Sequence, residues 1–292
     1  MLLLFLSLHA SAEVSSNLYA QRTYNAKGKV TELTYLDADG QVVVADNLGY
    51  ATVRYTYEGG TRLVLTEYFD AENQPVNCLD GYQSFRSVYN ANRIVTERIY
   101  RDAEGNAVIG PNGYARQVNK YYGKYHELTT HYDAEGNLLR SDTLYATHET
   151  TYRYASNTSR LALGDAYRDA DGNYTVGPDG YAYSEKAYQG NKIVSTAYYD
   201  PEGNLTINTS LGYALLEQTY SNGKYRKDAW YDEDRNLTAG PNGYAYVEYE
   251  YTNDNGTISY YYTADGEPYW TSEGCCGKKV ILGPRNREQS VS

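Results

Sequence analysis

The sequence has few of the residues from which a globular core is usually built. Its 292 residues include 3 Phe, 2 Trp and 1 Met against 37 Tyr. Leu, Ile and Val are also thin after residue 16. A buried tyrosine ring packs well while its hydroxyl keeps a polar partner, and tyrosine favours strands. The composition therefore predicts a thin sheet or ribbon with little deep interior.

Cysteine is equally scarce. Cys78, Cys275 and Cys276 are the only three, and a disulfide framework would show an even set at regular spacing. The adjacent pair lacks the second pair that a zinc site needs. We therefore expect no metal site and no cofactor, and we expect stability to come from the stacking of repeats.

Excess positive charge is absent as well. The formal net charge is −11 and the pI is near 4.9, so phosphate backbones are repelled and no nucleic-acid partner is expected. Solubility is the simple explanation of the acidity. Attraction of Ca²⁺ or of cationic ligands is the alternative.

Long apolar runs are missing except at the start. Leu2 to Leu8 is apolar apart from one serine, and Ala10-Ser11-Ala12 fits a small-x-small cleavage site. Residues 1–12 are thus predicted to be a signal peptide, with a first strand as the alternative. No other segment approaches the ~18 apolar residues that cross a bilayer, so we expect no integral membrane segment in the mature chain and a secreted or cell-surface location in a bacterium.

What the sequence does have is a repeat. A first landmark reads Tyr-x-Asp-x-x-Gly, as in Tyr167-Arg-Asp-Ala-Asp-Gly172. Its eight copies begin at Tyr35, Tyr68, Tyr100, His131, Tyr167, Tyr198, Trp230 and Tyr261. The spacings between these starts are 33, 32, 31, 36, 31, 32 and 31 residues. Such a period identifies a tandem repeat architecture.

A second landmark, Gly-Tyr-Ala or a close variant, has its tyrosine 14 or 15 residues after each start. The tyrosines are Tyr50, Tyr82, Tyr114, Tyr145, Tyr181, Tyr213 and Tyr244. Leu18-Tyr19-Ala20 reads as an additional copy at the start, and Gly274-Cys275-Cys276 replaces the motif in the eighth repeat. We therefore expect a repeat array over residues 17–274 and a non-repeat tail over residues 275–292, either solvated or a capping strand. The chain is also readable as a piece of a longer protein.

The turns between landmarks predict hairpins. Asp-Ala-Glu-Gly-Asn fits a type I turn with a glycine in a G1 bulge, and Gly-Pro-Asn-Gly fits a second tight turn. Each repeat then holds two or three short antiparallel strands, and no segment has helical periodicity. The predicted fold is all-β: an elongated tandem array of antiparallel hairpins, either a β-solenoid or an extended meander, with about eight repeats of about 32 residues.

One further tyrosine recurs six residues after the last residue of the second landmark. Its members are Tyr57, Tyr89, Tyr121, Tyr152, Tyr188, Tyr220 and Tyr251. Side chains an even distance apart on a strand share a face, so stacked repeats would align these seven residues, here called the seven-tyrosine column. The column could pack neighbouring repeats together, or it could form an aromatic strip that binds sugars or peptides.

Catalytic motifs are missing. Beyond residue 12 the histidines are His126, His131 and His148, which share no repeat position and have no metal-ligand spacing. Carboxylate pairs recur in nearly every turn, whereas an active site is normally unique, so we expect no enzymatic activity. Asp169-Ala-Asp171-Gly172 resembles half of a calcium loop, but it lacks the remaining carboxylates of an EF-hand and reads better as a turn.

The core Tyr132-Asp-Ala-Glu-Gly-Asn137 resembles the YD repeats of bacterial Rhs and teneurin-like proteins, although the unit here is longer. That resemblance implies hairpins coiled into a large shell. The doubled aromatic Tyr198-Tyr199 is similar to the choline- and glucan-binding repeats of Gram-positive surface proteins, which implies a hairpin solenoid with aromatic cages. Those cages usually rely on tryptophan, and only Trp230 and Trp270 occur here, so the resemblance carries over no ligand.

Together these patterns predict a non-catalytic repeat protein that binds cell-wall polymer or host glycan through the seven-tyrosine column. The alternative is a structural spacer or shell segment of a larger Rhs/YD-repeat-like surface protein or toxin, in which the tyrosines serve packing alone.

Overall fold

The structure is a computed structural model that describes residues 18–156, 159–252, 256–282 and 288–291. The predicted signal peptide, residues 1–12, lies outside this part of the chain. Every helix or strand element in the described ranges is a β-strand, which confirms the all-β prediction. The chain divides into two compact units, Met1–Arg140 and Ser141–Ser292.

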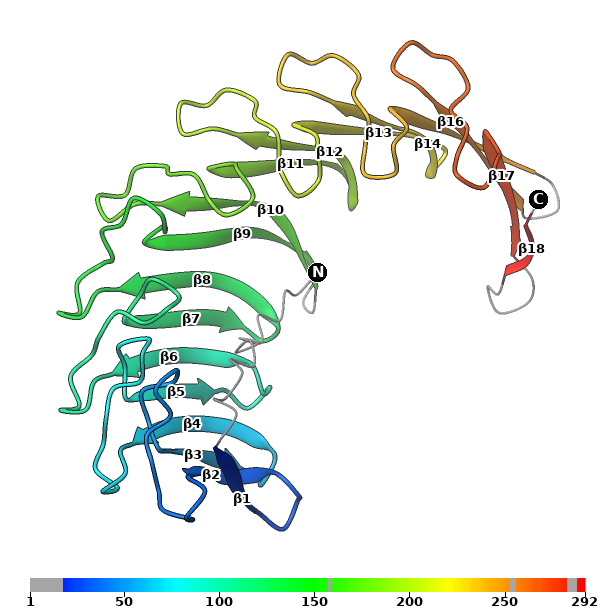
Figure 1. The fold of residues 1–292 in the computed structure, drawn as a ribbon. Helices are drawn as coiled ribbons and strands as arrows, with labels where there is room; N and C mark the ends of the chain where they lie inside the picture. Colours follow the sequence, from blue (N-terminus) through cyan, green and yellow to red (C-terminus); the bar gives the residue numbers. More distant parts are fainter. Residues whose placement is uncertain (1–17, 157–158, 253–255, 283–287, 292) are drawn as a thin grey trace. The chain divides into compact units, whose positions relative to one another are not determined.

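The first unit is a meander in which each strand pairs antiparallel with the next (Figure 1). Its strands are β1 (Tyr19–Tyr24), β2 (Val30–Leu36), β3 (Thr52–Glu58), β4 (Arg62–Phe69), β5 (Ser84–Tyr89), β6 (Val95–Arg101), β7 (Arg116–Tyr122) and β8 (Tyr125–Tyr132). Tight turns join β1 to β2, β3 to β4, β5 to β6 and β7 to β8, and longer loops connect the resulting hairpins.

The second unit repeats this order with its own antiparallel pairs. Its strands are β9 (Thr147–Ser156), β10 (Ser159–Arg168), β11 (Tyr183–Gln189), β12 (Lys192–Tyr199), β13 (Leu215–Ser221), β14 (Lys224–Tyr231), β15 (Tyr246–Tyr251), β16 (Gly256–Tyr262), β17 (Gly277–Leu282) and β18 (Glu288–Val291). Both units are therefore extended hairpin meanders, which is one of the two forms that the sequence predicted.

The Asp-x-x-Gly turn has the predicted geometry. In the sixth copy the Asp200 N–H donates to the Asn204 carbonyl at 2.9 Å, and Gly203 N–H donates back to the Asp200 carbonyl at 3.2 Å. Gly203 has φ of 90°, a conformation that costs glycine little. The Asp200 carboxylate accepts the Asn204 N–H at 2.8 Å. This turn reverses the chain so that the following loop folds back over one face of the sheet.

The folded-back loops build a buried stack of aromatic rings, here called the core column. It alternates the first residue of the first landmark with the tyrosine of the second. In the second unit, Tyr181 lies between Tyr167 and Tyr198 with ring centroids 5.6 and 4.9 Å away, and all three are buried. Offset and edge-to-face ring pairs at such distances attract each other. Ala182, next along the chain, is 0% exposed.

The core column continues through both units with the same alternation. Its first-unit members are Tyr35, Tyr50, Tyr68, Tyr82, Tyr100, Tyr114 and His131. Its second-unit members are Tyr145, Tyr167, Tyr181, Tyr198, Tyr213, Trp230, Tyr244 and Tyr261. The two landmarks recur because their aromatic residues form this core. His131 takes the place of the tyrosine as the last member of the first-unit column, and its ring lies parallel to Tyr114 at 4.8 Å.

Cys78 is also a packing residue of the repeat. It occupies the position ten residues after Tyr68, where other repeats have Ala45, Gly110 or Gly177. The position is small because it packs beneath the loop: Ala45 is 0% exposed and Cys78 is 7% exposed. Burial raises the pKa of the Cys78 thiol, as expected for a packing residue rather than a reactive one.

The repeat pattern extends beyond residue 274. Tyr261 N–H donates to the Cys276 carbonyl at 2.9 Å, as Tyr198 N–H donates to the Ala214 carbonyl at 2.9 Å. Gly274 has φ of 75°, and β17 follows and pairs with β16. At residue 275 the side chains depart from the repeat motif, but the backbone keeps the repeat conformation. The repeat therefore extends into the residues that were expected to be a tail.

At the start of the array, the pairing of β1 with β2 shows that Leu18-Tyr19-Ala20 is not a copy of the second landmark. Ala20 pairs with Tyr35 as Val53 pairs with Tyr68, so Leu18-Tyr19-Ala20 does not occupy the place of a Gly-Tyr-Ala landmark. Instead Tyr24, opposite Val30, takes the position that Tyr57 has opposite Leu63.

The longest repeat spacing, 36 residues, reflects a longer and irregular hairpin. Strands β9 and β10 have 10 residues each, and a bulge lies between Ala162 and Gly164. Strand β10 then pairs with β11 through one position, Ala166 opposite Tyr183, while β12 and β13 pair through three. A Cβ added to Gly164 would collide with the Ser184 backbone carbonyl, so only glycine lets these strands approach.

We expect Gly164→Ala to destabilise the second unit by about 1–3 kcal/mol, because the clash is with backbone and no side chain can move aside. Leu163→Ala, one residue away and 37% exposed, should change stability little. Urea unfolding followed by the fluorescence of Trp230 and Trp270, both in this unit, measures the difference. Equal stability of the two variants would show that the close approach at Gly164 does not constrain the fold.

Candidate functional site

The seven-tyrosine column is present but is not an exposed strip. All seven side chains are half-buried. Six of them lie near the end of their strand, opposite a residue at the start of the next strand, as Tyr188 lies opposite Ile193 and Tyr220 opposite Tyr225. Tyr152 lies within the longer strand β9, opposite Ala162. The predicted alignment therefore exists within each unit, at the edge of the sheet where the tight turns are.

The preceding repeat covers these rings. The Tyr188 hydroxyl donates to the Ala162 carbonyl at 2.6 Å, and the Arg153 guanidinium lies 4.7 Å from its ring centroid. Lys192 holds its ammonium 4.7 Å from the ring centroid of Tyr220. A cation over an aromatic face is an attractive contact, so each of these pairs joins one repeat to the next.

The first unit uses the same contacts. The Tyr89 hydroxyl donates to the Leu63 carbonyl at 3.2 Å, and the Arg62 guanidinium lies 5.1 Å from the Tyr89 ring centroid. Tyr24 has the same register position, but the described chain contains no strand before β1. Tyr24 is 59% exposed. This contrast identifies the preceding repeat as the source of the burial along the column.

The turns beside the column are linked as well. Asn25 Nδ2 donates to the Gly60 carbonyl at 3.0 Å, and the Arg153 and Lys192 side chains donate to the carbonyls of Gly190 and Gly223. A polar side chain from one turn thus satisfies a backbone carbonyl in the turn of the next repeat. Tyrosine rings and turn contacts together make this edge a joint between repeats.

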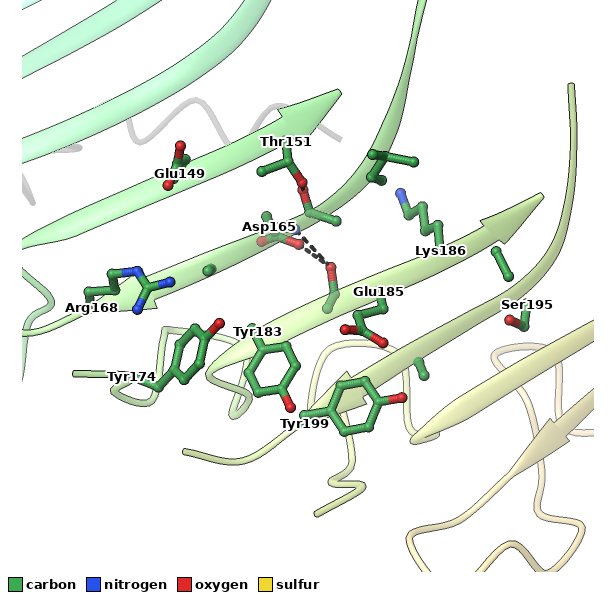
Figure 2. A pocket seen from close by; sticks show the side chains of 16 residues that line it. Glu149, Thr151, Asp165, Arg168, Tyr174, Tyr183, Glu185, Lys186, Ser195 and Tyr199 are labelled. Atoms are coloured by element: carbon green, nitrogen blue, oxygen red, sulfur yellow. Dashed lines mark hydrogen bonds between the residues drawn. The ribbon is translucent and has the colours of Figure 1, made fainter. Parts of the chain in front are cut away.

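The second unit carries a different feature on the face that the loops leave open. A hollow of about 400 Å³ lies over β9 to β12 (Figure 2). Small residues form its floor, among them Gly164, Ala166 and Ala197. The rings of Tyr174, Tyr183 and Tyr199 line one end. The volume lies within the range of small-molecule sites, roughly 300–1,000 Å³.

The three rings form a continuous wall. Tyr174 stacks on Tyr183 with centroids 4.6 Å apart, and Tyr183 stacks on Tyr199 at 4.8 Å. The Arg168 guanidinium lies 4.2 Å from the Tyr174 centroid and donates to the Gly172 carbonyl at 3.0 Å. The wall is therefore held from one side by Arg168.

Two carboxylates border the hollow. Glu149 lies opposite Ala166, and Glu185 lies opposite Ala197. Both side chains are exposed, and neither forms an ion pair within the described chain. Burial and the nearby Glu185 carboxylate raise the pKa of Tyr183 and of Tyr199. The hollow thus combines negative charge, phenol hydroxyls and an apolar floor.

A polar cluster holds β10 to β11 where the backbone pairing is sparse. Asp165 accepts hydrogen bonds from the Tyr181 hydroxyl at 2.8 Å and from Ser184, and it lies 2.9 Å from His148 Nε2. Burial alone would favour the neutral acid, but the hydrogen bonds from His148, Ser184 and Tyr181 prevail and lower the pKa of Asp165. This cluster positions the strands that carry the hollow.

In the described residues no group of three or more His, Cys, Asp or Glu side chains is arranged to hold a metal ion. The same part of the chain contains no helix long and apolar enough to cross a membrane. The arrangement at the hollow supplies hydrogen-bonding groups and charge, and its residues can bind a ligand without a cofactor.

The hollow was not predicted from the sequence. A signal was present in the doubled aromatic Tyr198-Tyr199, where one ring joins the core column and the other points to the opposite face. The other residues of the hollow could not be predicted in this way. Tyr174 lies in a loop, and Gly164 contributes only the space left by its missing side chain.

Comparisons with known proteins leave the chain without a family. No protein-family model matches it, and no curated protein matches it. Similar solved structures include a crystal structure of TcdB2-TccC3-TEV, with 13% identity over 91% of this chain and a TM-score of 0.29. Another is TcdB2-TccC3 without the hypervariable C-terminal region, with 11% identity over 94% and a TM-score of 0.24. A third is a Photorhabdus luminescens Tc holotoxin pore, with 14% identity over 91% and a TM-score of 0.26. The chain spans between 13% and 16% of the length of those chains.

Removing a covered tyrosine should weaken the joint between repeats. We expect Tyr188→Ala to destabilise the chain by about 2 kcal/mol, since a half-buried ring is lost, and Tyr188→Phe by about 1 kcal/mol, since one hydrogen bond is lost. Tyr24→Ala is the matched control and should cost no more than about 0.5 kcal/mol. Urea unfolding followed by circular dichroism measures all three. A cost at Tyr24 equal to that at Tyr188 would contradict the role of the preceding repeat.

Acid should loosen the cluster around Asp165. Because its pKa is lowered in the fold, below the unfolded value of about 3.9, the unfolded chain binds the proton more readily. The stabilisation is complete at pH values above the unfolded pKa and is lost as pH falls through the folded pKa. Asp165→Asn should therefore be less stable at neutral pH and lose less stability on acidification. Thermal unfolding between about pH 6 and pH 3 measures this, and identical pH dependence in both proteins would contradict it.

Proposed function

We propose that this chain is a non-catalytic structural segment, a hairpin-repeat scaffold in which tyrosines serve mainly to pack each repeat on the next. The observation that carries the proposal is the contrast between Tyr24, which is 59% exposed, and its half-buried equivalents such as Tyr188. Where a preceding repeat is present, its cations and carbonyls occupy the surface of the ring. A binding strip would need that surface free.

The energetics of such an array suit a spacer or shell segment. Each repeat contacts only its neighbours, so stability grows with the number of interfaces. The resemblance of Tyr132–Asn137 to YD repeats agrees with this reading. The apolar start of the sequence, residues 1–12, supports a place outside a bacterial cell or on its surface.

Glycan binding is the second candidate function, and one observation favours it. The open face of the second unit has a hollow with tyrosine, carboxylate and hydroxyl groups over an alanine floor, a combination that suits a polar ligand with apolar patches. This moves the binding hypothesis from the seven-tyrosine column to Tyr174, Tyr183 and Tyr199.

Sedimentation of the full chain with purified bacterial cell walls and insoluble glycans separates the two candidates. The scaffold proposal predicts no saturable binding that depends on the column, so Tyr188→Phe should sediment like the wild type. Saturable binding that Tyr188→Phe abolishes, in a variant that circular dichroism shows to be folded, would overturn it. Binding that survives Tyr188→Phe and is lost in Tyr183→Ala would establish the second candidate.

A further inference from the structure

The hollow has an internal counterpart two repeats further along the chain. Around the hollow, Glu149, Ala166, Tyr183 and Tyr199 are successive cross-strand neighbours. In the later repeat the same four residue types recur in one line, as Glu217, Ala229, Tyr246 and Tyr262. The two tyrosine pairs also stack alike, with centroids 4.8 Å apart at 15° in the first and 4.6 Å apart at 11° in the second.

In the later repeat the space beside the tyrosines is filled by a lysine of the chain itself. The Lys227 ammonium lies 3.7 Å from the ring centroid of Tyr246 and 3.5 Å from Glu248 Oε1. Lys227 is two residues before Ala229 and lies opposite Glu248. In this repeat the Tyr246 ring and the Glu248 carboxylate together hold a primary ammonium on an alkyl stem.

The equivalent position at the hollow has no side chain. Gly164 is two residues before Ala166, as Lys227 is before Ala229, and Glu185 is two residues after Tyr183, as Glu248 is after Tyr246. Tyr174 stacks on Tyr183 and covers the ring face that corresponds to the one Lys227 contacts in Tyr246, so an ammonium at the hollow would meet the carboxylates and the ring edges. Glu185 is left without the cross-strand cation that its equivalent has.

Among the residues that the structure describes, the other charged side chains around the hollow do not form ion pairs with Glu149 or Glu185. Arg168, beside the tyrosine wall, is held by the Tyr174 ring and the Gly172 carbonyl, and Arg235 lies near Tyr199 at the other end of the wall. Asp165 is taken up by His148, Ser184 and Tyr181. Lys186 also lines the hollow, but strand alternation directs its side chain to the face opposite Glu185. Glu149 and Glu185 thus form no ion pair in this part of the chain; the Glu185 carboxylate accepts a hydrogen bond from the Tyr199 hydroxyl and keeps its negative charge toward the hollow.

The first unit is different at this register position. It has Arg54 where the second unit has Glu185, and Arg54 already pairs with Glu32 at 2.7 Å. Cross-strand charge pairs therefore form at this position in Arg54–Glu32 and Glu248–Lys227, whereas Glu185 has no cation opposite it on β10.

We infer that the hollow binds a ligand bearing a primary ammonium group, held between Glu149 and Glu185 with its carbon skeleton on the alanine floor and the tyrosine edges. Amino sugars and linear polyamines both carry this group. The site is additional to the scaffold role and does not depend on the seven-tyrosine column.

Isothermal titration of the full chain with a glucosamine oligosaccharide, its N-acetylated counterpart and spermidine tests the inference. At least one of the two amines should bind saturably, at one site per chain, and more weakly as salt is raised. The N-acetylated oligosaccharide, which lacks the charge, should bind at least about tenfold more weakly than the free amine. Binding of glucosamine alone would identify an amino sugar, and binding of spermidine alone would identify a polyamine.

Three charge-removing variants localise the binding. Glu149→Gln and Glu185→Gln should each weaken it by about tenfold, whereas Glu217→Gln, which changes the residue that corresponds to Glu149 two repeats later, should leave it unchanged. All three substitutions are exposed and circular dichroism checks that they fold. Absence of saturable amine binding, equal binding of the N-acetylated form, or equal weakening by Glu217→Gln would each overturn the inference.

Discussion

Ring-to-ring packing between successive repeats is the interaction on which the rest of the structure depends. A single hairpin is marginal in water, and these hairpins have little aliphatic residue to bury. The loop after each hairpin therefore folds back and places one tyrosine, such as Tyr181, between the aromatic residues of two neighbouring hairpins. The landmark spacing, the positive-φ glycines and the 0% exposed alanines all serve to hold those rings in place.

This constraint explains which parts of the fold were predictable. The Asp-x-x-Gly turn has a local mechanism, so its geometry at Asp200 and Gly203 follows from sequence. The alignment of the seven tyrosines follows from strand alternation, and it is found. Which tyrosines form the core does not follow, because Tyr50 and Tyr68 meet only after a loop has folded back over the sheet. Likewise, the continuation of the repeat through Cys276 lies in backbone hydrogen bonds, which a sequence period does not report.

The candidate site shows the same division. Strand alternation predicted the alignment of the column, but the environment of its tyrosines comes from neighbours such as Arg153 and Lys192 in the preceding repeat. The hollow exists because Gly164 and Ala166 leave space, and a pattern search that looks for functional groups passes over small residues. One face of the sheet is thus packed under the loops in every repeat. The residues on the other face vary among repeats, and a binding site can form there.

The central claim is that adjacent rings of the core column stabilise the array by contact with one another. A double-mutant cycle on Tyr181→Leu and Tyr198→Leu, measured by urea unfolding, tests it most directly, with Tyr181 and Trp230 as a non-adjacent control pair. The account predicts a coupling free energy of about 0.5–1.5 kcal/mol for the adjacent pair and additivity within about 0.5 kcal/mol for the control pair. Additive effects in the adjacent pair would contradict it and would assign the stability to burial of each ring alone.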